Sequence, residues 1–531
     1  MKKQVKTLIN SAQAATIFVA LMGIPVLYAQ SSLPQLGDGE AMSVVAERKL
    51  GTRIAREIYR DPDYLDDPLV GDYVQRIWQP LLKAARTRGD ITAEQDARFA
   101  WEVMLARDRT VNAFALPGGY LGVHLGLIAI VGNRDELASV LAHELSHVTQ
   151  RHIARITGKQ SQQAPWVLGA MILGALAARK NPEVANAVIT GSQAAGAQAQ
   201  LNFSRDMERE ADRLGYQVLQ DAGFAVQGFV GMFDKLAQAN RINDNGSFPY
   251  LRTHPLTSER IGDMQSRMQL AFASTLAPTA ATAAALATEH AIIATRSRLL
   301  ANPAVDVLRS EIAQARSVLT AKNPTHGDRL IAQLYGGAMA ALRLRELDLA
   351  QQLALRASEV LKNTQNGPLS TAEYAQTAID FIAIDIALAQ NSPALARSKL
   401  APYLQTAILR RPVLLQWATL AALPIAAPSA DLALARDSLQ NWVAEHPRDA
   451  LAWEALSNLY TIQGQRLRAM RAQAEARVAV LDYSAALDRF KAGQDLAKTG
   501  GATGADYIES SIIDARTRVV QAQLREMESE K

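Results

Sequence analysis

The sequence predicts a mainly α protein: an N-terminal α+β domain with a small sheet, followed by a C-terminal solenoid of helical repeats. Three observations support this prediction. Apolar residues alternate from 99 to 105 as in a half-buried strand and two short strand-like segments follow, most of the remaining chain has helical apolar spacing, and a 34-residue pattern occurs near 450. At 531 residues the chain is too long for one hydrophobic core, so two or three domains are expected.

Composition narrows the class of protein. There is no cysteine, which excludes disulfides and thiolate metal ligands. The formal net charge is +4, and it falls to +1 if Lys2, Lys3 and Lys6 are removed with an export signal. We expect no nucleic-acid binding from a nearly neutral chain.

Residues 1–31 predict a signal peptide. The three lysines form its charged start, and residues 14–29 form a short apolar core. The small residues at the junction allow cleavage after Ala29 or after Ser31. The alternative is an uncleaved membrane anchor, although the apolar run is short for a span.

The domain expected at 32–271 begins with helices and continues into strands. In chain order, the predicted elements are a helix at 41–59, an acidic turn at 61–67, a helix at 73–84, strands at 99–105, 111–115 and 120–124, and a helix at 125–131. The stretch Asn112-Ala113-Phe114-Ala115 is a candidate substrate-binding edge, because an exposed edge strand can pair with an extended peptide. An internal strand is the alternative. His124 is expected on a strand surface and not as a ligand.

The pentapeptide His143-Glu144-Leu145-Ser146-His147 lies on a predicted helix that Asn133 and Glu136 would begin as a capping box. Residues four apart share a helix face, so both imidazoles can reach one ion while apolar residues pack the opposite face. Two imidazoles and a carboxylate suit Zn²⁺, and Glu144 could take a proton from metal-bound water. The alternative is a chance pair of surface histidines.

A carboxylate ligand is available about sixty residues later. Glu208 and Asp212 share a face of another predicted helix, so Glu208 could complete the metal site while Asp212 holds a histidine by its free ring N–H. A solvated acidic face is the alternative. His152 is interpreted as a helix-end histidine, because Gln150 and Ile153 depart from the three-histidine extension of the motif.

Taken together, these motifs resemble the M48 family of zinc metallopeptidases. The stretch Asn112 to Tyr120 and the sequence Arg252-Thr253-His254-Pro255 share the resemblance, which covers about residues 33–265. It implies a zincin-like fold and one Zn²⁺ per chain. The metal ligands would be His143, His147 and Glu208, with Glu144 as the base and Asp212 as a further catalytic residue. His254 would also belong to the site. His254 would act either as a regulatory fourth ligand or as an oxyanion donor.

Two segments before the repeats allow more than one interpretation. Residues 165–178 and 182–199 are rich in Ala and Gly, and they predict packed internal helices, a cover over the active cleft, or a membrane contact. Residues 272–294 are predicted to be a linker, on the strength of the Ala, Thr and Pro content of 272–289.

Residues 295–531 are predicted to be tetratricopeptide-like. With Ala450 as position 1 of a 34-residue unit, seven residues fall in register: Trp453, Leu456, Ser457, Tyr460, Gly464, Ala469 and Ala476. Leu481 stands where proline is expected. Weaker units occur near 331 and at 372–404, and a plain helical bundle is the alternative. A solenoid of this kind binds proteins on its concave face.

The resemblance is to the periplasmic branch of the family. It implies a secreted endopeptidase that degrades misassembled envelope proteins, above all outer-membrane β-barrel proteins, and assists their assembly. Its repeats would dock to the barrel-assembly machinery, with the protein associated with the outer membrane. The competing hypothesis is a chaperone or scaffold with a vestigial metal site, against which the presence of Glu144 counts. An integral membrane peptidase is disfavoured, since no spanning segment follows the signal.

Overall fold

The computed structural model describes residues 42–158, 205–241, 248–270, 279–320, 327–364, 372–406, 408–424, 429–499 and 504–529. All of these belong to one compact unit, Met42–Lys531. The predicted signal peptide at 1–31 and the helices expected at 165–178 and 182–199 lie outside the described residues.

The first described elements are helical. They are α1 (Val44–Arg60), the short strand β1 (Tyr64–Leu65), α2 (Pro68–Arg88) and α3 (Ala93–Arg98). Helix α2 is longer than the predicted 73–84, because Asp67 caps it, Pro68 occupies its first turn, and Gly89 at φ 80° ends it. The acidic turn expected at 61–67 instead contains β1, and α3 was not predicted.

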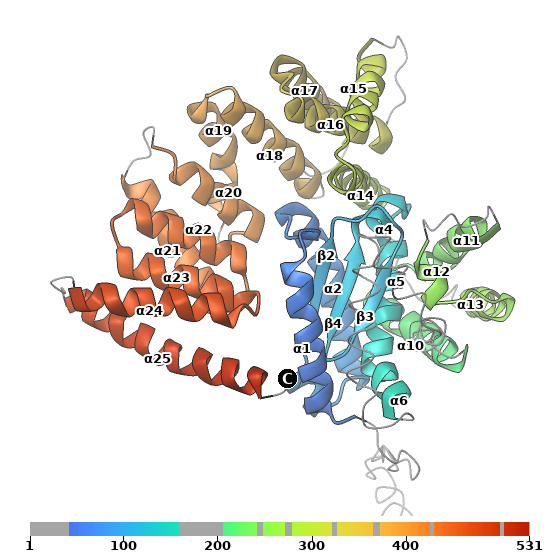
Figure 1. Ribbon diagram of the computed structural model, residues 1–531. Coiled ribbons are helices and arrows are strands. Elements are labelled where there is room, and N and C mark those ends of the chain that lie inside the picture. The colour runs from blue at the N-terminus through green and yellow to red at the C-terminus, as the bar shows by residue number, and fades with distance from the viewer. Residues whose placement is uncertain are drawn as a thin grey trace, which may run out of the picture. The chain divides into compact units, whose positions relative to one another are not determined.

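A four-stranded sheet follows, with β2 (Glu102–Ala106), β3 (Ala113–Leu116) and β4 (Tyr120–His124) joining β1 in the order β1-β2-β4-β3. Strand β4 pairs in parallel with β2 and antiparallel with β3. Three predicted strands therefore exist, although β2 begins three residues later than expected. Among the described strands, β3 is an edge strand, as Figure 1 shows.

The two faces of the sheet pack against different helices. Phe114 lies on the face that α1 covers, with Ile54 and Leu116 among its neighbours in that apolar cluster. Gly122 makes room for its ring, since a Cβ there would come within 2.2 Å of Phe114. Ala113 and Ala115 point to the other face, in the same core as the helix that carries the two motif histidines.

The rest of this part of the chain is helical. Its helices are α4 (Leu125–Ile130), α5 (Arg134–Thr149), α6 (His152–Gly158), α10 (Arg205–Asp221), α11 (Gln227–Arg241), α12 (Tyr250–Thr253) and α13 (Ser258–Leu270). The Asn133 side chain caps α5 by accepting a hydrogen bond from the Glu136 N–H at 2.9 Å. The predicted reciprocal bond is not formed, because the Glu136 carboxylate accepts from the N–H of Gly132 instead, at 2.6 Å.

Helix α5 is buried around its whole circumference. The predicted apolar packing face is confirmed, and the face that carries the two histidines is buried as well. The cause is that α10 and α11 cover the side opposite the sheet. The motif histidines consequently lie inside the protein and not on its surface.

The prediction of a linker at 272–294 is wrong over most of that range. Helix α14 (Ala280–Ala301) runs through it and past the domain boundary at 295. Alanine is the strongest helix former, so the Ala-rich composition favours a helix more than a flexible connection. The helix packs on both α4 and α16, and His290 Nε2 lies 2.9 Å from the carbonyl oxygen of Val131.

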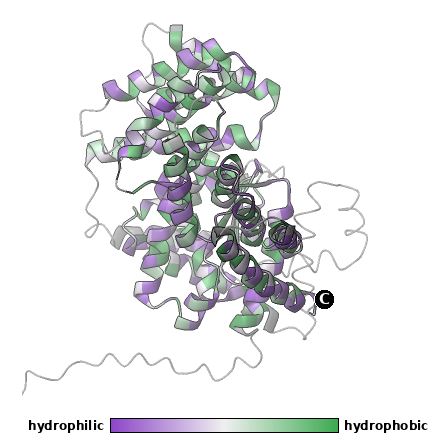
Figure 2. Ribbon diagram, turned by 90° about the vertical axis from the view of Figure 1, so that its left-hand side faces the viewer, coloured by the Kyte–Doolittle hydropathy of each residue, from purple (hydrophilic) through white to green (hydrophobic). Residues whose placement is uncertain are grey.

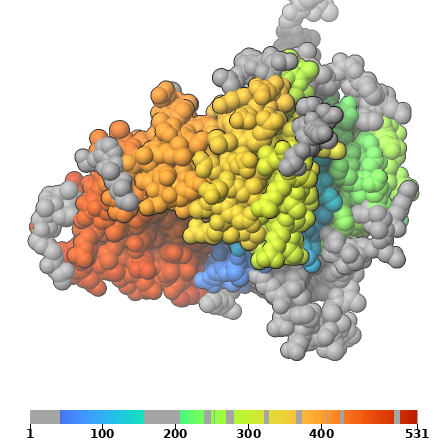
Figure 3. All heavy atoms as spheres, turned by 90° about the horizontal axis from the view of Figure 1, so that it is seen from above, coloured from blue at the N-terminus to red at the C-terminus, as the bar shows by residue number. Residues whose placement is uncertain are grey.

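Helices continue to the C-terminus. They are α15 (Val305–Thr320), α16 (Asp328–Arg343), α17 (Leu347–Thr364), α18 (Glu373–Ala389), α19 (Pro393–Leu400), the 3₁₀ turn η2 (Ala401–Gln405), α20 (Arg411–Ala421), α21 (Ser429–Glu445), α22 (Ala450–Ile462), α23 (Arg466–Ala479), α24 (Tyr483–Thr499) and α25 (Gly504–Glu528). Consecutive helices contact each other, and the colours in Figure 3 accordingly run from yellow through orange to red in chain order. Figure 2 shows polar and apolar residues alternating along these helices, as amphipathic packing requires.

Helix pairs occur where the repeat pattern places them. Helices α22 and α23 coincide with the unit that begins at Ala450, and Gly464 forms the turn between them at φ 71°. Leu481 adopts φ 60° where the pattern expects proline. Helices α16 and α17 match the unit near 331, and α18 and α19 match the pair at 372–404. Membership of the tetratricopeptide class stays a prediction. None of the helices within the described ranges has the length and apolar character needed to cross a membrane.

Candidate metal centre and active site

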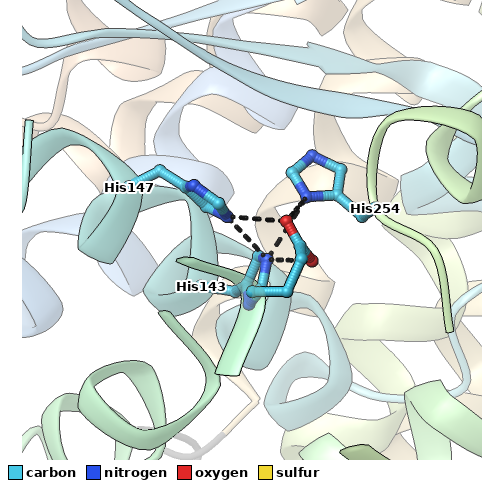
Figure 4. A group of neighbouring side chains, drawn as sticks. His143, His147 and His254 are labelled. Atoms are coloured by element: carbon cyan, nitrogen blue, oxygen red, sulfur yellow. Dashed lines mark hydrogen bonds and ion pairs between the residues drawn. The ribbon is translucent and has the colours of Figure 1, made fainter. Parts of the chain in front are cut away.

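Helix α5 provides the first two candidate ligands. Because His143 and His147 are one turn apart, their rings project from the same side, and their Nε2 atoms lie 3.0 Å from each other. Both side chains are buried. In Figure 4 the two rings turn toward a common point beside a carboxylate and His254.

Helix α10 provides that carboxylate. Glu208 places Oε1 3.4 Å from Nε2 of His147 and Oε2 3.5 Å from Nε2 of His143. One turn later, Asp212 Oδ1 lies 3.0 Å from Nδ1 of His143. Helices α5 and α10 come this close because Gly215 has no side chain: a Cβ there would come within 3.1 Å of the backbone of Ala142 and His143.

The third imidazole comes from the loop after α12. His254 Nδ1 lies 3.1 Å from Glu208 Oε1 and 3.4 Å from His143 Nε2. Its ring stacks on Tyr250, with ring centroids 4.5 Å apart. The Tyr250 N–H donates to the carbonyl of Val111 at 3.3 Å, which ties this loop to the residues just before β3.

The four side chains have the spacing of a metal site. One ligand atom from each of His143, His147, Glu208 and His254 lies within 4.8 Å of the others. Tetrahedral zinc with bonds of about 2.0–2.1 Å would set its ligand atoms about 3.3 Å apart. Among His143, His147 and Glu208 the separations are 3.0–3.5 Å and bracket that value, so these three residues fit such an ion.

Electrostatics also favour a cation here. Burial disfavours a charged imidazole, but the carboxylates of Asp212 and Glu208 outweigh it and raise the pKa of His143 to about 9. Burial, together with the neighbouring histidines, lowers the pKa of His147. Burial also works to raise the pKa of Glu208, yet the surrounding imidazoles hold it well below its usual range. Negative charge is thus concentrated where the ring nitrogens meet.

Glu144 is fully buried next to this cluster. Neither of its carboxylate oxygens accepts a hydrogen bond from the part of the chain that the structure describes. The nearest charged partner is His254, whose Nε2 lies 3.4 Å from Glu144 Oε1. A buried carboxylate with so few partners is costly, which indicates a role other than stability.

Arg260 is a site residue that the sequence did not reveal. Its guanidinium donates to both oxygens of Asp212, at 2.6 and 2.8 Å, and lies 2.8 Å from Glu208 Oε2. It also donates to the carbonyl of Pro255 at 2.8 Å. One buried cation therefore joins α10 to the His254 loop. No motif spacing could have identified it, because the contact is between a loop, α10 and α13.

Of two other histidines, His124 differs from its predicted environment, whereas His152 lies at a helix end as predicted, at the first residue of α6. His124 is buried and not on a strand surface; its Nδ1 lies 2.9 Å from the hydroxyl of Thr110, and it is outside the metal cluster. His152 is fully buried, with Nδ1 2.9 Å from Nδ1 of His147. Burial lowers the pKa of His152 to about 4.

The candidate edge lies beside the site. Strand β3 contacts α5, and Asn112 Oδ1 is a buried atom that accepts no hydrogen bond from the described residues. Phe114 points to the α1 side of the sheet, so only the backbone of Ala113 to Ala115 and the Asn112 amide remain candidates for contact with a peptide.

Comparison with known proteins shows sequence similarity to peptidases. Residues 71–268 match the profile described as peptidase family M48. The beta-barrel assembly-enhancing protease of Yersinia pestis is 29% identical over 462 residues, covering 85% of each chain. The Escherichia coli protein of that name is 31% identical over 273 residues, which are 50% of this chain and 53% of that one. The mitochondrial metalloendopeptidase OMA1 of Saccharomyces cerevisiae is 28% identical over 196 residues, 36% of this chain and 54% of its own. The last two alignments thus cover about half of each relative.

Proposed function

We propose that this protein is a zinc-dependent endopeptidase, a function supported by the match of residues 71–268 to the profile of peptidase family M48. The observation that carries the proposal is the convergence of His143 Nε2, His147 Nε2 and the Glu208 carboxylate at tetrahedral spacing. These three residues would hold one ion per chain. A zinc ion, when bound, supplies a Lewis acid for the peptide carbonyl and acidifies a water molecule.

The chain supplies the proton transfer. Glu144 takes a proton from the attacking water and delivers it to the leaving amine, as a general base and then a general acid. Its two buried oxygens, which accept no hydrogen bond from the described residues, support this role. Asp212 Oδ1, 3.0 Å from Nδ1 of His143, would hold the proton of the neutral ring on that nitrogen and so leave Nε2 free to bind the ion.

The substrate would bind as an added strand on β3. Its edge position supports this proposal, since a peptide paired there runs beside α5 and its base. The small side chains of Ala113 and Ala115 leave the recognition to main-chain hydrogen bonds, which tolerate many sequences. Asn112 Oδ1 would accept an N–H from the same peptide.

His254 would regulate the site as a latch. Its Nδ1 takes the fourth corner of the ligand set, and its Nε2 faces Glu144, so the ring lies between the ligands and the base. A catalytic zinc site keeps that corner for water. Withdrawal of the loop would open the corner. In the alternative role the withdrawn ring donates a hydrogen bond to the developing oxyanion.

We further propose a periplasmic location, with misassembled outer-membrane β-barrel proteins as substrates. The printed names of the Yersinia and Escherichia relatives support a connection with barrel assembly, and the lysine-led apolar start of the chain supports export. The tetratricopeptide-like helix pairs would dock to the barrel-assembly machinery. Association with the outer membrane, removal of the signal after Ala29 or Ser31, and assistance to assembly belong to the same proposal.

A chaperone or scaffold with a non-catalytic metal site is the second candidate. The fully buried four-residue ligand set favours it, because structural zinc sites are closed by protein ligands. The two functions differ in what Glu144 does. Comparing the zinc content and peptide cleavage of wild type with those of Glu144→Gln separates them, since only an endopeptidase loses activity while it keeps its zinc.

A further inference from the structure

The turn between α5 and α6 directs His152 back toward a metal ligand. Arg151 adopts φ 52°, a left-handed conformation that a non-glycine residue takes only at a cost. A salt bridge of 2.7 Å from Arg151 to the buried carboxylate of Glu47 holds the turn. As a result α6 begins at His152, whose ring meets His147 edge to face, with centroids 4.8 Å apart.

The hydrogen bonds around His152 have one consistent direction. Nε2 of His147 belongs to the candidate ligand set with His143 and Glu208, so when this nitrogen binds an ion it supplies the lone pair and the proton lies on Nδ1. That proton is donated to Nδ1 of His152, 2.9 Å away. The remaining proton of His152 therefore lies on Nε2, which donates to Oε2 of Glu210 at 3.1 Å.

Glu210 completes the chain at the surface. It lies on α10, between the candidate ligand Glu208 and Asp212, the residue that contacts His143, and it is partly exposed. Arg155 of α6 donates to the same Glu210 oxygen at 2.8 Å, which keeps the carboxylate turned toward His152. The hydrogen-bonded chain thus extends from His147 through a buried imidazole to a partly exposed ion pair.

We propose that His152, supported by Glu210, is a positioning residue that fixes the ring plane and tautomer of the metal ligand His147, in parallel with Asp212 on His143. The inference rests on the metal site of the proposed function. It gives each α5 histidine its own orienting partner: a charged carboxylate for one and a neutral imidazole for the other. Such partners typically contribute 10–100-fold in metal affinity. We expect His152 near the low end, because a neutral acceptor stabilises a bound cation less than a carboxylate does.

The test measures zinc affinity by competition with a chelator, using the full-length folded protein. His152→Leu fills the space without an acceptor and should weaken zinc binding about 10-fold. His152→Asn places an amide oxygen near the position of Nδ1 and should restore most of the affinity. Glu210→Ala, at a partly exposed position, should weaken binding by a smaller factor, because the imidazole remains.

His124→Leu is the matched control. It removes another buried imidazole of the same domain, outside the ligand set, and should lower the melting temperature without changing zinc affinity. Folded His152→Leu and Glu210→Ala with wild-type zinc affinity would overturn the inference, as would equal losses in His152→Leu and His152→Asn. Wild type without zinc affinity would instead overturn the proposed function, and this inference with it.

Discussion

Oδ1 of Asp212 lies 3.0 Å from Nδ1 of His143, on the ring nitrogen opposite to the one that faces His147. This contact determines which nitrogen of His143 carries a proton. A carboxylate can only accept, so Nδ1 must donate, and in the neutral ring that binds a metal Nε2 then carries the lone pair. The ring is therefore oriented for a cation before one binds.

Removing this carboxylate should weaken the metal site. We expect Asp212→Ala to lower zinc affinity about 10–100-fold, because the ring can then turn and exchange tautomers. Chelator competition measures the effect. Asp206→Asn, an exposed carboxylate in the first turn of α10, is the control and should leave affinity unchanged. Wild-type zinc binding by folded Asp212→Ala would show that packing alone orients His143.

Arg260 should matter chiefly for stability. It is buried against the carboxylates of Asp212 and Glu208, and truncation leaves both without their cation. Arg260→Ala should lower the free energy of unfolding of the metal-free protein by about 3–5 kcal/mol, as measured by urea denaturation. Arg209→Ala, which removes an exposed arginine from α10, the helix that carries Asp212 and Glu208, should change little. Equal effects of the two substitutions would contradict the account of Arg260.

His254→Ala distinguishes the two roles proposed for the His254 side chain. If the ring is a latch, the variant should cleave itself and casein faster than wild type, because the fourth corner is then free for water. If the ring is an oxyanion donor, kcat should instead fall about 100-fold with zinc retained. His446→Ala, at an exposed histidine of the repeats, is the control. Unchanged activity would remove His254 from both roles.

Acid should weaken the attachment of α14 to α2. Burial works to raise the pKa of Asp67, but the Arg296 guanidinium, at 2.7 Å, and backbone N–H donors hold it below its ordinary value. A depressed folded pKa contributes stability above the unfolded value of about 3.9, and this is lost as pH falls through the folded pKa. Below about pH 4, the melting temperature should therefore fall more steeply with decreasing pH for wild type than for Asp67→Asn.

The control for this comparison is Asp437→Asn, which changes an exposed carboxylate whose partner Arg436 is its neighbour in sequence. It should leave the acid slope of the melting temperature unchanged. If Asp67→Asn also keeps the wild-type slope, the Asp67–Arg296 pair does not contribute to acid sensitivity.

The sequence predicts those parts of the site in which the residues lie on the same helix. His143 and His147 share a face of α5, and Glu208 and Asp212 share a face of α10, so helical spacing alone groups each pair. Strand β4 was likewise predicted with its observed limits, because the Pro117-Gly118-Gly119 turn directly precedes it.

The parts that were missed depend on contacts between elements. Arg260 and His152 reach the site through loops and turns that have no fixed spacing, and Arg151 shows no sequence signal for its left-handed conformation. Helix α14 was missed because an Ala- and Thr-rich composition suits both a linker and a packed helix. Only the apolar partners supplied by α4 and α16 decide between them.

The central claim is that this buried ligand set serves peptide-bond hydrolysis with Glu144 as the base. The most direct measurement is the zinc content and the casein cleavage of four proteins: wild type, Glu144→Gln, His254→Ala and the double variant Glu144→Gln/His254→Ala. The two proteins with His254→Ala are included so that a latch cannot hide activity. The account predicts one zinc per chain in all four proteins, and cleavage that Glu144→Gln lowers by about 10²–10⁴-fold. Zinc-loaded protein that cleaves nothing in either His254 background, or Glu144→Gln protein that cleaves at the wild-type rate, would contradict it.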